Sequence, residues 1–173
     1  MKLNKLFCNF NELVTKCPNW KCRPLQGTIK MNDKDLILQA IEEAKNSEEP
    51  LKCGVIIAKD GVIVAKTHNE QRKTNNVTAH AEIIAIKEAG QKLGRKNLDD
   101  CVIYCTCEPC TMCLSAIIFA KIPKLYFGTL LKNASPNHLP ITLTTAELLN
   151  HSKHKIEIIS EFMSGQCAKL LYS

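Results

Sequence analysis

The sequence predicts an α/β fold, a three-layer α/β/α sandwich built on a mixed five-stranded sheet. Three observations support this prediction: an amphipathic helix pattern is followed by a β-hairpin pattern, helices and strands then alternate, and neither an internal repeat nor a low-complexity tract interrupts them. A hairpin that continues into alternating helices and strands places helices on both faces of one sheet. The 173 residues suit one compact domain with a substantial buried core.

Helical spacing begins after Asn32, a residue type that caps helices, and apolar residues then recur on one face over about 33–46. Two apolar runs, 53–58 and 62–65, flank an Asp-Gly dipeptide and predict a β-hairpin. The same patterns predict a loop over 69–78, helices over 79–92 and 109–120, strands over 101–105 and 125–127, a mostly irregular segment over 129–143, a short helix from 144 or 145 to 149, a strand over 156–159 and a helix over 162–171.

Residues 1–30 differ from the rest of the chain. They contain two prolines, the only tryptophan and three cysteines, and their hydrophobic periodicity is weak. We predict that they form an N-terminal extension packed on a domain over residues 31–173. Cys8, Cys17 and Cys22 in this extension either bind a second metal or are buried as small hydrophobic residues.

Ten cysteines are many for a chain of this length. In a secreted protein they would suggest a disulfide framework. However, the first residues develop no apolar segment typical of a signal peptide, and no apolar run is long enough to span a bilayer. We therefore expect a cytoplasmic protein with no membrane partner, whose reduced thiols are core residues or metal ligands. Cys53, Cys101 and Cys167 fall in strand or helix patterns and are expected in the core.

Lysine and arginine number 23 against 17 aspartate and glutamate residues, which gives a net charge of +6. This excess fits an anionic partner such as a nucleotide or RNA, and it fits a solvated basic surface equally well. Lys92, Arg95 and Lys96 form a local basic cluster that we interpret as a solvated helix end. His151 and His154 lie near another helix end, and we interpret them as surface or structural residues.

Two short segments carry the residues suited to chemistry. His80 and Glu82 stand at the start of one predicted helix, and Cys110 and Cys113 stand where a strand runs into another. Two cysteines three positions apart share one face of a helix, and Pro109 suits its first turn because proline lacks an N–H group. The free N–H groups and the dipole of a helix N-terminus stabilise thiolates. The spacing therefore predicts that both sulfur atoms can bind one metal ion.

His80, Cys110 and Cys113 form a ligand set that suits zinc. One neutral imidazole and two thiolates balance the charge of Zn²⁺ and leave a fourth position for water, as in catalytic zinc sites. Zinc lowers the pKa of water, and Glu82 is placed to move protons without being a ligand. Taken alone, the Cys-x-x-Cys pair also suits a redox pair or half of a zinc finger, and the His-Ala-Glu segment suits a plain helix start. Their joint occurrence favours one catalytic zinc ion.

His-x-Glu followed by Pro-Cys-x-x-Cys is the signature of zinc-dependent deaminases. Residues 33–171 resemble the cytidine deaminase-like superfamily, and within it the branch of tRNA adenosine deaminases, guanine deaminases and cytosine deaminases. The runs Thr78–Ala89 and Tyr104–Ile122 carry this likeness. The resemblance implies a three-layer fold, a homodimer, one zinc ion per chain, and Glu82 as the group that carries protons.

The resemblance also implies that Asn69 and Ala81 contact the substrate, although a lone Asn at this point would also suit a turn. It does not select one substrate. The segment Cys105–Glu108 resembles guanine deaminases, whereas residues 154–158 and 166–171 resemble the end of tRNA adenosine deaminases.

Three departures from these families bear on the substrate. Asn133 falls near the position where guanine deaminases carry an aspartate that reads the base, Asn76 replaces another common aspartate, and no aromatic, arginine-rich tail follows Leu171. We therefore predict hydrolytic deamination of a small nucleobase or nucleoside, a purine in preference, in a pocket with aromatic walls such as Phe127. The alternatives are a tRNA wobble adenosine-to-inosine deaminase, a cytosine or cytidine deaminase, and a non-catalytic zinc protein that binds RNA or other proteins.

Overall fold

The structure is a computed structural model that describes residues 29–134, 141 and 143–172. The strands within these residues are β1 Gly54–Lys59, β2 Val62–His68, β3 Cys101–Cys107, β4 Lys124–Thr129 and β5 Glu157–Ile159. They form one sheet in the order β2-β1-β3-β4-β5. β1 runs antiparallel to β2 and β3, whereas β3, β4 and β5 are parallel. The predicted mixed five-stranded sheet is confirmed.

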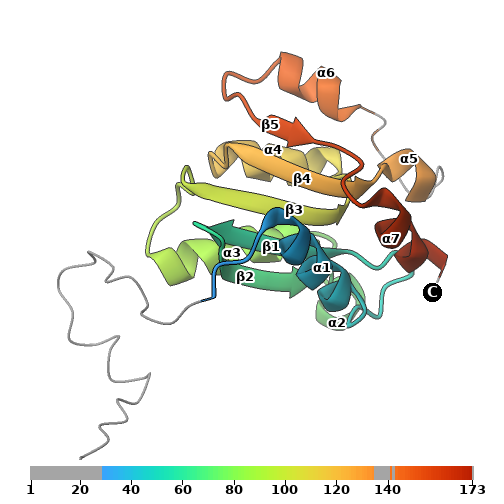
Figure 1. The fold of residues 1–173 in the computed structure, drawn as a ribbon. Coiled ribbons are helices and arrows are strands. Elements are labelled where there is room, and N and C mark those ends of the chain that lie inside the picture. Colours follow the sequence, from blue (N-terminus) through green and yellow to red (C-terminus); the bar gives the residue numbers. More distant parts are fainter. Residues whose placement is uncertain (1–28, 135–140, 142, 173) are drawn as a thin grey trace, which may run out of the picture.

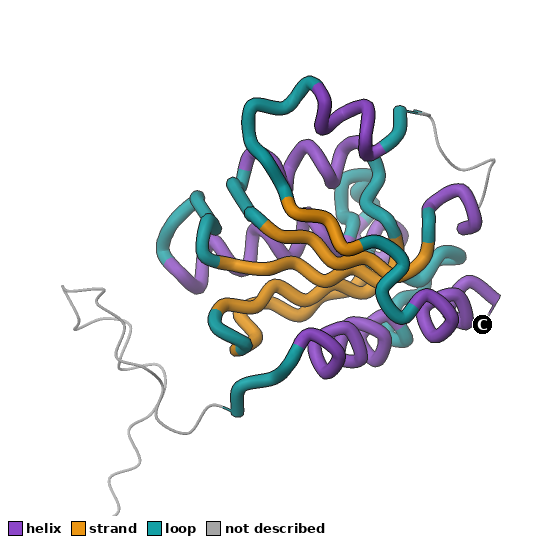
Figure 2. Tube along the Cα trace, turned by 45° about the horizontal axis from the view of Figure 1, so that its top comes forward, coloured by secondary structure: helices purple, strands orange, loops and turns teal. Residues whose placement is uncertain are grey.

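Helices cover both faces of this sheet. The helices are α1 Asp33–Ala44, α2 Gln71–Thr74, α3 Ala81–Leu93, α4 Thr111–Phe119, α5 Leu131–Ala134, α6 Thr145–Asn150 and α7 Ser164–Ala168, which a 3₁₀ helix, Lys169–Tyr172, follows. α1 and α7 lie on one face, and α3 and α4 lie on the other (Figure 1). Figure 2 shows the strands as the middle one of three layers. The fold is therefore the predicted α/β/α sandwich.

The central strand β1 supplies both hydrophobic cores because successive side chains point to opposite faces of a sheet. Val55 and Ile57 pack in the core beneath α3 and α4, and Ile56 and Ala58 pack in the core beneath α1 and α7. All four side chains are at most 1% exposed. A strand buried on both faces is an almost continuous apolar run, which is the pattern that the sequence shows here.

Asp33 fastens α1 to the sheet. Its two carboxylate oxygens accept hydrogen bonds from the hydroxyl groups of Tyr104 on β3, at 2.7 Å, and Tyr126 on β4, at 2.6 Å. The two tyrosine rings stack with centroids 4.8 Å apart. The helix itself begins as predicted, because the Asn32 side chain accepts a hydrogen bond from the Asp35 N–H group.

Two positions beside β1 require glycine, one because of its backbone conformation and the other because of the space available. Gly61, with φ +78°, follows Asp60 in the turn between β1 and β2, where both residues need positive φ. Gly54 begins β1 directly against α1, so a Cβ atom there would lie 2.0 Å from the carbonyl oxygen of Ala40. The close approach of helix and strand at this point requires glycine.

The boundaries differ from the predictions in several places. Residues 69–78 were expected to be a loop but contain the short helix α2, whereas 129–143, expected to be mostly irregular, contains the one-turn helix α5. A helix of one turn has too few residues for periodicity to reveal it. The helix predicted over 109–120 begins at Thr111, and the one predicted over 162–171 is α7 plus a 3₁₀ turn.

Lys92 and Lys96 of the basic cluster are exposed, in keeping with the solvated helix end expected there, and Arg95 is half-buried. The Arg95 guanidinium pairs with Asp99 and Asp100, and the Lys92 ammonium group donates to the carbonyl oxygen of Val64 at 3.0 Å. Most of the predicted extension lies outside the described residues, and so do its three cysteines. Among the helices that the structure describes, none has the length and hydrophobicity to cross a membrane.

Candidate active site

His80 and Glu82 stand at the N-terminus of α3. His80 is the N-cap, and its carbonyl oxygen accepts the first helical hydrogen bond, from Ile84 N–H. The Thr67 hydroxyl group on β2 donates to the carbonyl oxygen of Ala81 at 2.8 Å, which fixes this end of the helix against the sheet. The sequence thus places an imidazole and a carboxylate together at the carboxyl end of β3.

Cys110 and Cys113 stand at the start of α4. Cys110 is the N-cap, and Cys113 lies in the first turn with no exposed surface. Pro109 precedes the N-cap, so its predicted place inside the first turn is wrong. Both sulfur atoms can still bind one metal ion as predicted, because an N-cap residue and the third residue after it project toward the same side of the helix end.

The three predicted ligands meet in space. His80 Nδ1 lies 3.4 Å from Cys113 Sγ and 3.7 Å from Cys110 Sγ, and the three donor atoms all lie within 4.8 Å of one another. Tetrahedral zinc with ordinary bond lengths would hold nitrogen and sulfur ligands about 3.5 Å apart. The donor set and its spacing therefore fit one Zn²⁺ ion.

The pKa values of the thiol and carboxyl groups at the site are shifted in different directions. The pKa of Cys110 is lowered to about 4, because the Cys113 thiol and the His80 ring donate hydrogen bonds to its sulfur. The Cys110 sulfur and burial in turn raise the pKa of Cys113. Burial also raises the pKa of Glu82 above its ordinary value, although hydrogen bonds with its own backbone and with Cys113 oppose the shift. A buried carboxyl group with a raised pKa can both take and return a proton near neutral pH.

His80, Glu82 and Cys110 line a cavity of about 450 Å³, a volume within the usual range of about 300–1,000 Å³ for small-molecule sites. Glu82 lies in its wall and is 6% exposed. The apolar part of the wall comes from Pro50, Leu51, Val77, Met112, Leu131 and Ile141. The cavity is therefore of a size for a flat heterocycle, with two of the candidate metal ligands, His80 and Cys110, and the Glu82 carboxyl group among its lining residues.

Asn69 and Ala81 both line this cavity. The Asn69 side-chain oxygen Oδ1 accepts hydrogen bonds from the Ser47 hydroxyl at 2.7 Å and the Cys53 N–H at 3.0 Å. Its amide nitrogen donates to the carbonyl oxygen of Leu51 at 2.7 Å, and a second contact, to Gln71 Oε1, is 3.4 Å long. The side chain is thus fixed in orientation and retains one N–H group that is only weakly engaged.

Several residues singled out in the sequence lie elsewhere. Phe127 is 3% exposed in the core beneath α3 and α4, so its prediction as a pocket wall is wrong. Asn133 belongs to α5 and does not line the cavity, and the Asn76 side chain accepts hydrogen bonds from Thr78. His154 contacts the carbonyl oxygen of Ile122, in keeping with the structural role expected for it.

No sequence pattern marked Glu49, Cys53 or Glu108 as site residues, yet all three line the cavity. Cys53 precedes β1 and is half-buried in the wall, whereas Cys101 and Cys167 are buried in the core as predicted. Glu108 accepts hydrogen bonds from Leu131 N–H, at 3.1 Å, and the Thr145 hydroxyl, at 2.6 Å. It thereby ties the metal-site loop to α5 and α6, a role that no local sequence pattern signals.

The fold and the site define a zinc-dependent deaminase, a hydrolase that acts on C–N bonds. The family model of the cytidine and deoxycytidylate deaminase zinc-binding region matches residues 30–129. The chain belongs to this family, within the cytidine deaminase-like superfamily.

Relatives with named activities include tRNA-specific adenosine deaminases and a guanine deaminase. The tRNA-specific adenosine deaminase of Aquifex aeolicus is 36% identical over 137 residues, which cover 76% of this chain and 91% of that protein. The guanine deaminase of Bacillus subtilis is 50% identical over 74 residues, which cover 43% of this chain and 47% of that protein. A solved structure from a study of tRNA:A34 deaminases aligns with TM-score 0.69 and 30% identity, covering 79% of this chain and 99% of that one.

Proposed function

We propose that the protein hydrolytically deaminates a small nucleobase or nucleoside, a purine in preference, and releases ammonia. His80, Cys110 and Cys113 hold the zinc ion, and Glu82 carries the protons. One observation supports this proposal above all: the buried Glu82 carboxyl group lines the same cavity as His80 and Cys110, whose donor atoms form one cluster with Cys113 Sγ, all within 4.8 Å of one another. A purely structural zinc site has no use for such a carboxyl group.

The chain's own residues account for the proton transfers. When bound, zinc lowers the pKa of water and so supplies a nucleophile at neutral pH. The Glu82 carboxylate takes a proton from the attacking water and gives it to the ring nitrogen beside the carbon that carries the amine. The Glu82 carboxylate then takes the second proton of the added water and gives it to the amine, which leaves as ammonia. Its burial excludes bulk water, and its raised pKa suits a group that gives the proton back.

The cavity favours an uncharged substrate. The ionisable side chains among its described lining residues, apart from the cysteines, are Glu49, His80, Glu82 and Glu108, with no lysine or arginine. A phosphate group would meet carboxylates there and find no cationic partner. Asn69 orients the base or sugar through its weakly engaged N–H group, and Ala81 contacts the ring where no side chain larger than methyl intrudes.

Deamination of a tRNA wobble adenosine is the second candidate, because the Aquifex aeolicus relative that aligns over 137 residues is named a tRNA-specific adenosine deaminase. We also propose a cytoplasmic homodimer. Val77, at the cavity, is 80% exposed, and Phe119, at the end of α4, is 85% exposed. Large apolar side chains that stand in solvent favour burial against a second subunit.

An ammonia-release assay tests the proposed function. The zinc-loaded protein is assayed with guanine, guanosine, adenine, adenosine, cytosine and cytidine, and with an anticodon stem-loop that carries adenosine at the wobble position. We expect turnover on a free purine. Inosine formed in the stem-loop, with no ammonia from any small compound, would replace the proposal by the tRNA activity. No turnover on any of them would favour the non-catalytic scaffold.

A further inference from the structure

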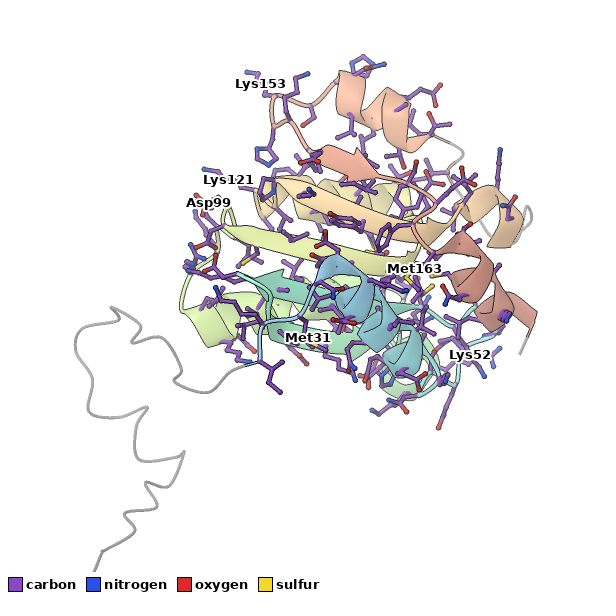
Figure 3. The ribbon with its side chains drawn as sticks, in the orientation of Figure 1. Met31, Lys52, Asp99, Lys121, Lys153 and Met163 are labelled. Carbon is purple, nitrogen blue, oxygen red and sulfur yellow. The ribbon has the colours of Figure 1, made fainter. Side chains whose placement is uncertain are left out.

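Cys53 and Cys107 are two thiols in the cavity wall that neither the metal site nor the proposed reaction uses. They lie opposite each other in the sheet. The register of β1 and β3 pairs Val55 with Cys105 and Ile56 with Tyr104. Continued by two residues, this antiparallel register places Cys53 directly across from Cys107. Sulfur atoms gather at this end of the sheet in Figure 3.

The pairing of Cys53 with Cys107 is of the non-hydrogen-bonded type, in which opposite side chains of antiparallel strands lie closest. Cys53 uses its backbone on the side away from β3, since its N–H donates to Asn69 Oδ1 at 3.0 Å and its carbonyl oxygen accepts from Asn69 N–H at 3.2 Å. Toward β3 it is therefore a non-hydrogen-bonded position. In such antiparallel pairs the Cα atoms lie about 4.5 Å apart and the side chains are closest. Disulfides span Cα separations of about 4.4–6.8 Å, so this pair falls at the short end of the range in which one forms.

The two side chains also interact directly. The largest cause of the raised pKa of Cys53 is its hydrogen bond with the Cys107 side chain, followed by burial. Both thiols border the cavity, through which a small reagent reaches them. The other cysteine of this wall, Cys110, is held by zinc in the proposed enzyme.

We propose that Cys53 and Cys107 are an oxidisable thiol pair, which a hydroperoxide converts into a disulfide across the cavity wall. One thiol attacks an oxygen of the O–O bond and becomes a sulfenic acid, releasing water or an alcohol. The second thiol displaces the hydroxyl group from that sulfur, forming the S–S bond and a second water. The two sulfur atoms lose two electrons and two protons, which the hydroperoxide accepts.

The bond alters the substrate cavity. Cys53 lies between Leu51 and the start of β1, and the backbone of both residues holds the Asn69 side chain. Cys107 is three residues before the ligand Cys110. A disulfide between the two sulfur atoms therefore shifts the Cys53 backbone, which holds the Asn69 side chain, while the zinc ligands keep their positions. This effect on substrate binding rests on the proposed function, whereas formation of the disulfide does not.

The test uses the full-length zinc-loaded protein and hydrogen peroxide in slight excess. After alkylation of free thiols, digestion and mass spectrometry, we expect a disulfide-linked pair of peptides that contain Cys53 and Cys107, with zinc content unchanged and reversal by dithiothreitol. Cys53→Ala should abolish the linked peptides, and the matched variant Cys101→Ala, which removes a buried thiol at the other end of β3, should keep them. Both thiols found alkylated after peroxide treatment, or oxidation confined to the zinc ligands with loss of zinc, would overturn the proposal.

A second measurement addresses the consequence. With a substrate identified by the ammonia assay, the oxidised protein should show a raised KM and a smaller change in kcat, and dithiothreitol should restore both. An unchanged KM in protein that contains the disulfide would overturn the effect on substrate binding. Because the disulfide is detected by mass, failure of the deaminase assay and failure of this proposal are distinguishable.

Discussion

His80 Nδ1 lies 3.4 Å from Cys113 Sγ, although the two residues are 33 positions apart in the chain. The contact exists because α3 and α4 both begin at the same end of the sheet and pack on the same face. Each helix presents one or more ligands at its N-terminus, and the sheet sets the distance between them. The metal site is thus a property of the fold as much as of the motif.

The first prediction concerns the metal. Purified protein should contain one equivalent of zinc, and His80→Ala or Cys113→Ala should lose most of it, since two remaining ligands bind zinc weakly. Cys101→Ala, which removes a buried thiol far from the ligands, should retain the metal. Elemental analysis measures this content. Full zinc retention in both Cys110→Ala and Cys113→Ala would reject the site.

The second prediction concerns Glu82. Glu82→Gln keeps the size and polarity of the side chain but cannot cycle a proton, so zinc should stay while kcat falls by about two to four orders of magnitude. Glu88→Gln, an exposed position on the same helix, is the matched control and should keep full activity. A Glu82→Gln enzyme within a few-fold of the wild type would remove this residue from the mechanism.

The third prediction tests the packing of α1 on β1. Gly54→Ala should lower the free energy of unfolding by roughly 3 kcal/mol, because the new methyl group meets the Ala40 carbonyl oxygen at 2.0 Å. Gly165→Ala is the control: nothing lies within 4 Å of its Cβ position in α7, and the change should stabilise by about 0.4–1 kcal/mol. Urea titration measures both. Equal stability of the two variants would contradict the close approach of helix and strand.

The local patterns predicted the fold and the metal ligands because both depend on short stretches of chain. The apolar face of α1, the turn after β1 and the spacing of Cys110 and Cys113 are each visible within a few residues. The start of α4 at Thr111 was harder to predict, because a proline suits the residues just before a helix as well as its first turn.

What the sequence could not supply is pairing between distant residues. Cys53 resembles any cysteine at the start of a strand, and its neighbour Cys107 is known only once the register of β1 and β3 is known. Phe127 was expected in the pocket, but the alternation along β4 turns it into the core. Nothing near Asp33 indicates that its partners are tyrosines 71 and 93 residues away.

The last prediction concerns this Asp33 cluster at alkaline pH. Burial and the hydrogen bond to Asp33 raise the pKa of Tyr104, and the same two causes raise that of Tyr126. A group whose pKa is higher in the folded than in the unfolded protein stabilises the fold fully below its unfolded pKa, about 10 for tyrosine, and loses that contribution as the pH rises further. The free energy of unfolding should therefore fall between pH 9 and 11 more steeply in the wild type than in Tyr104→Phe. At pH 8, Tyr104→Phe should itself be less stable by about 1.5–3 kcal/mol, the usual contribution of a hydrogen bond to a charged group. Urea titrations under reducing conditions at each pH measure both effects, and parallel pH profiles for the two proteins would contradict the raised tyrosine pKa.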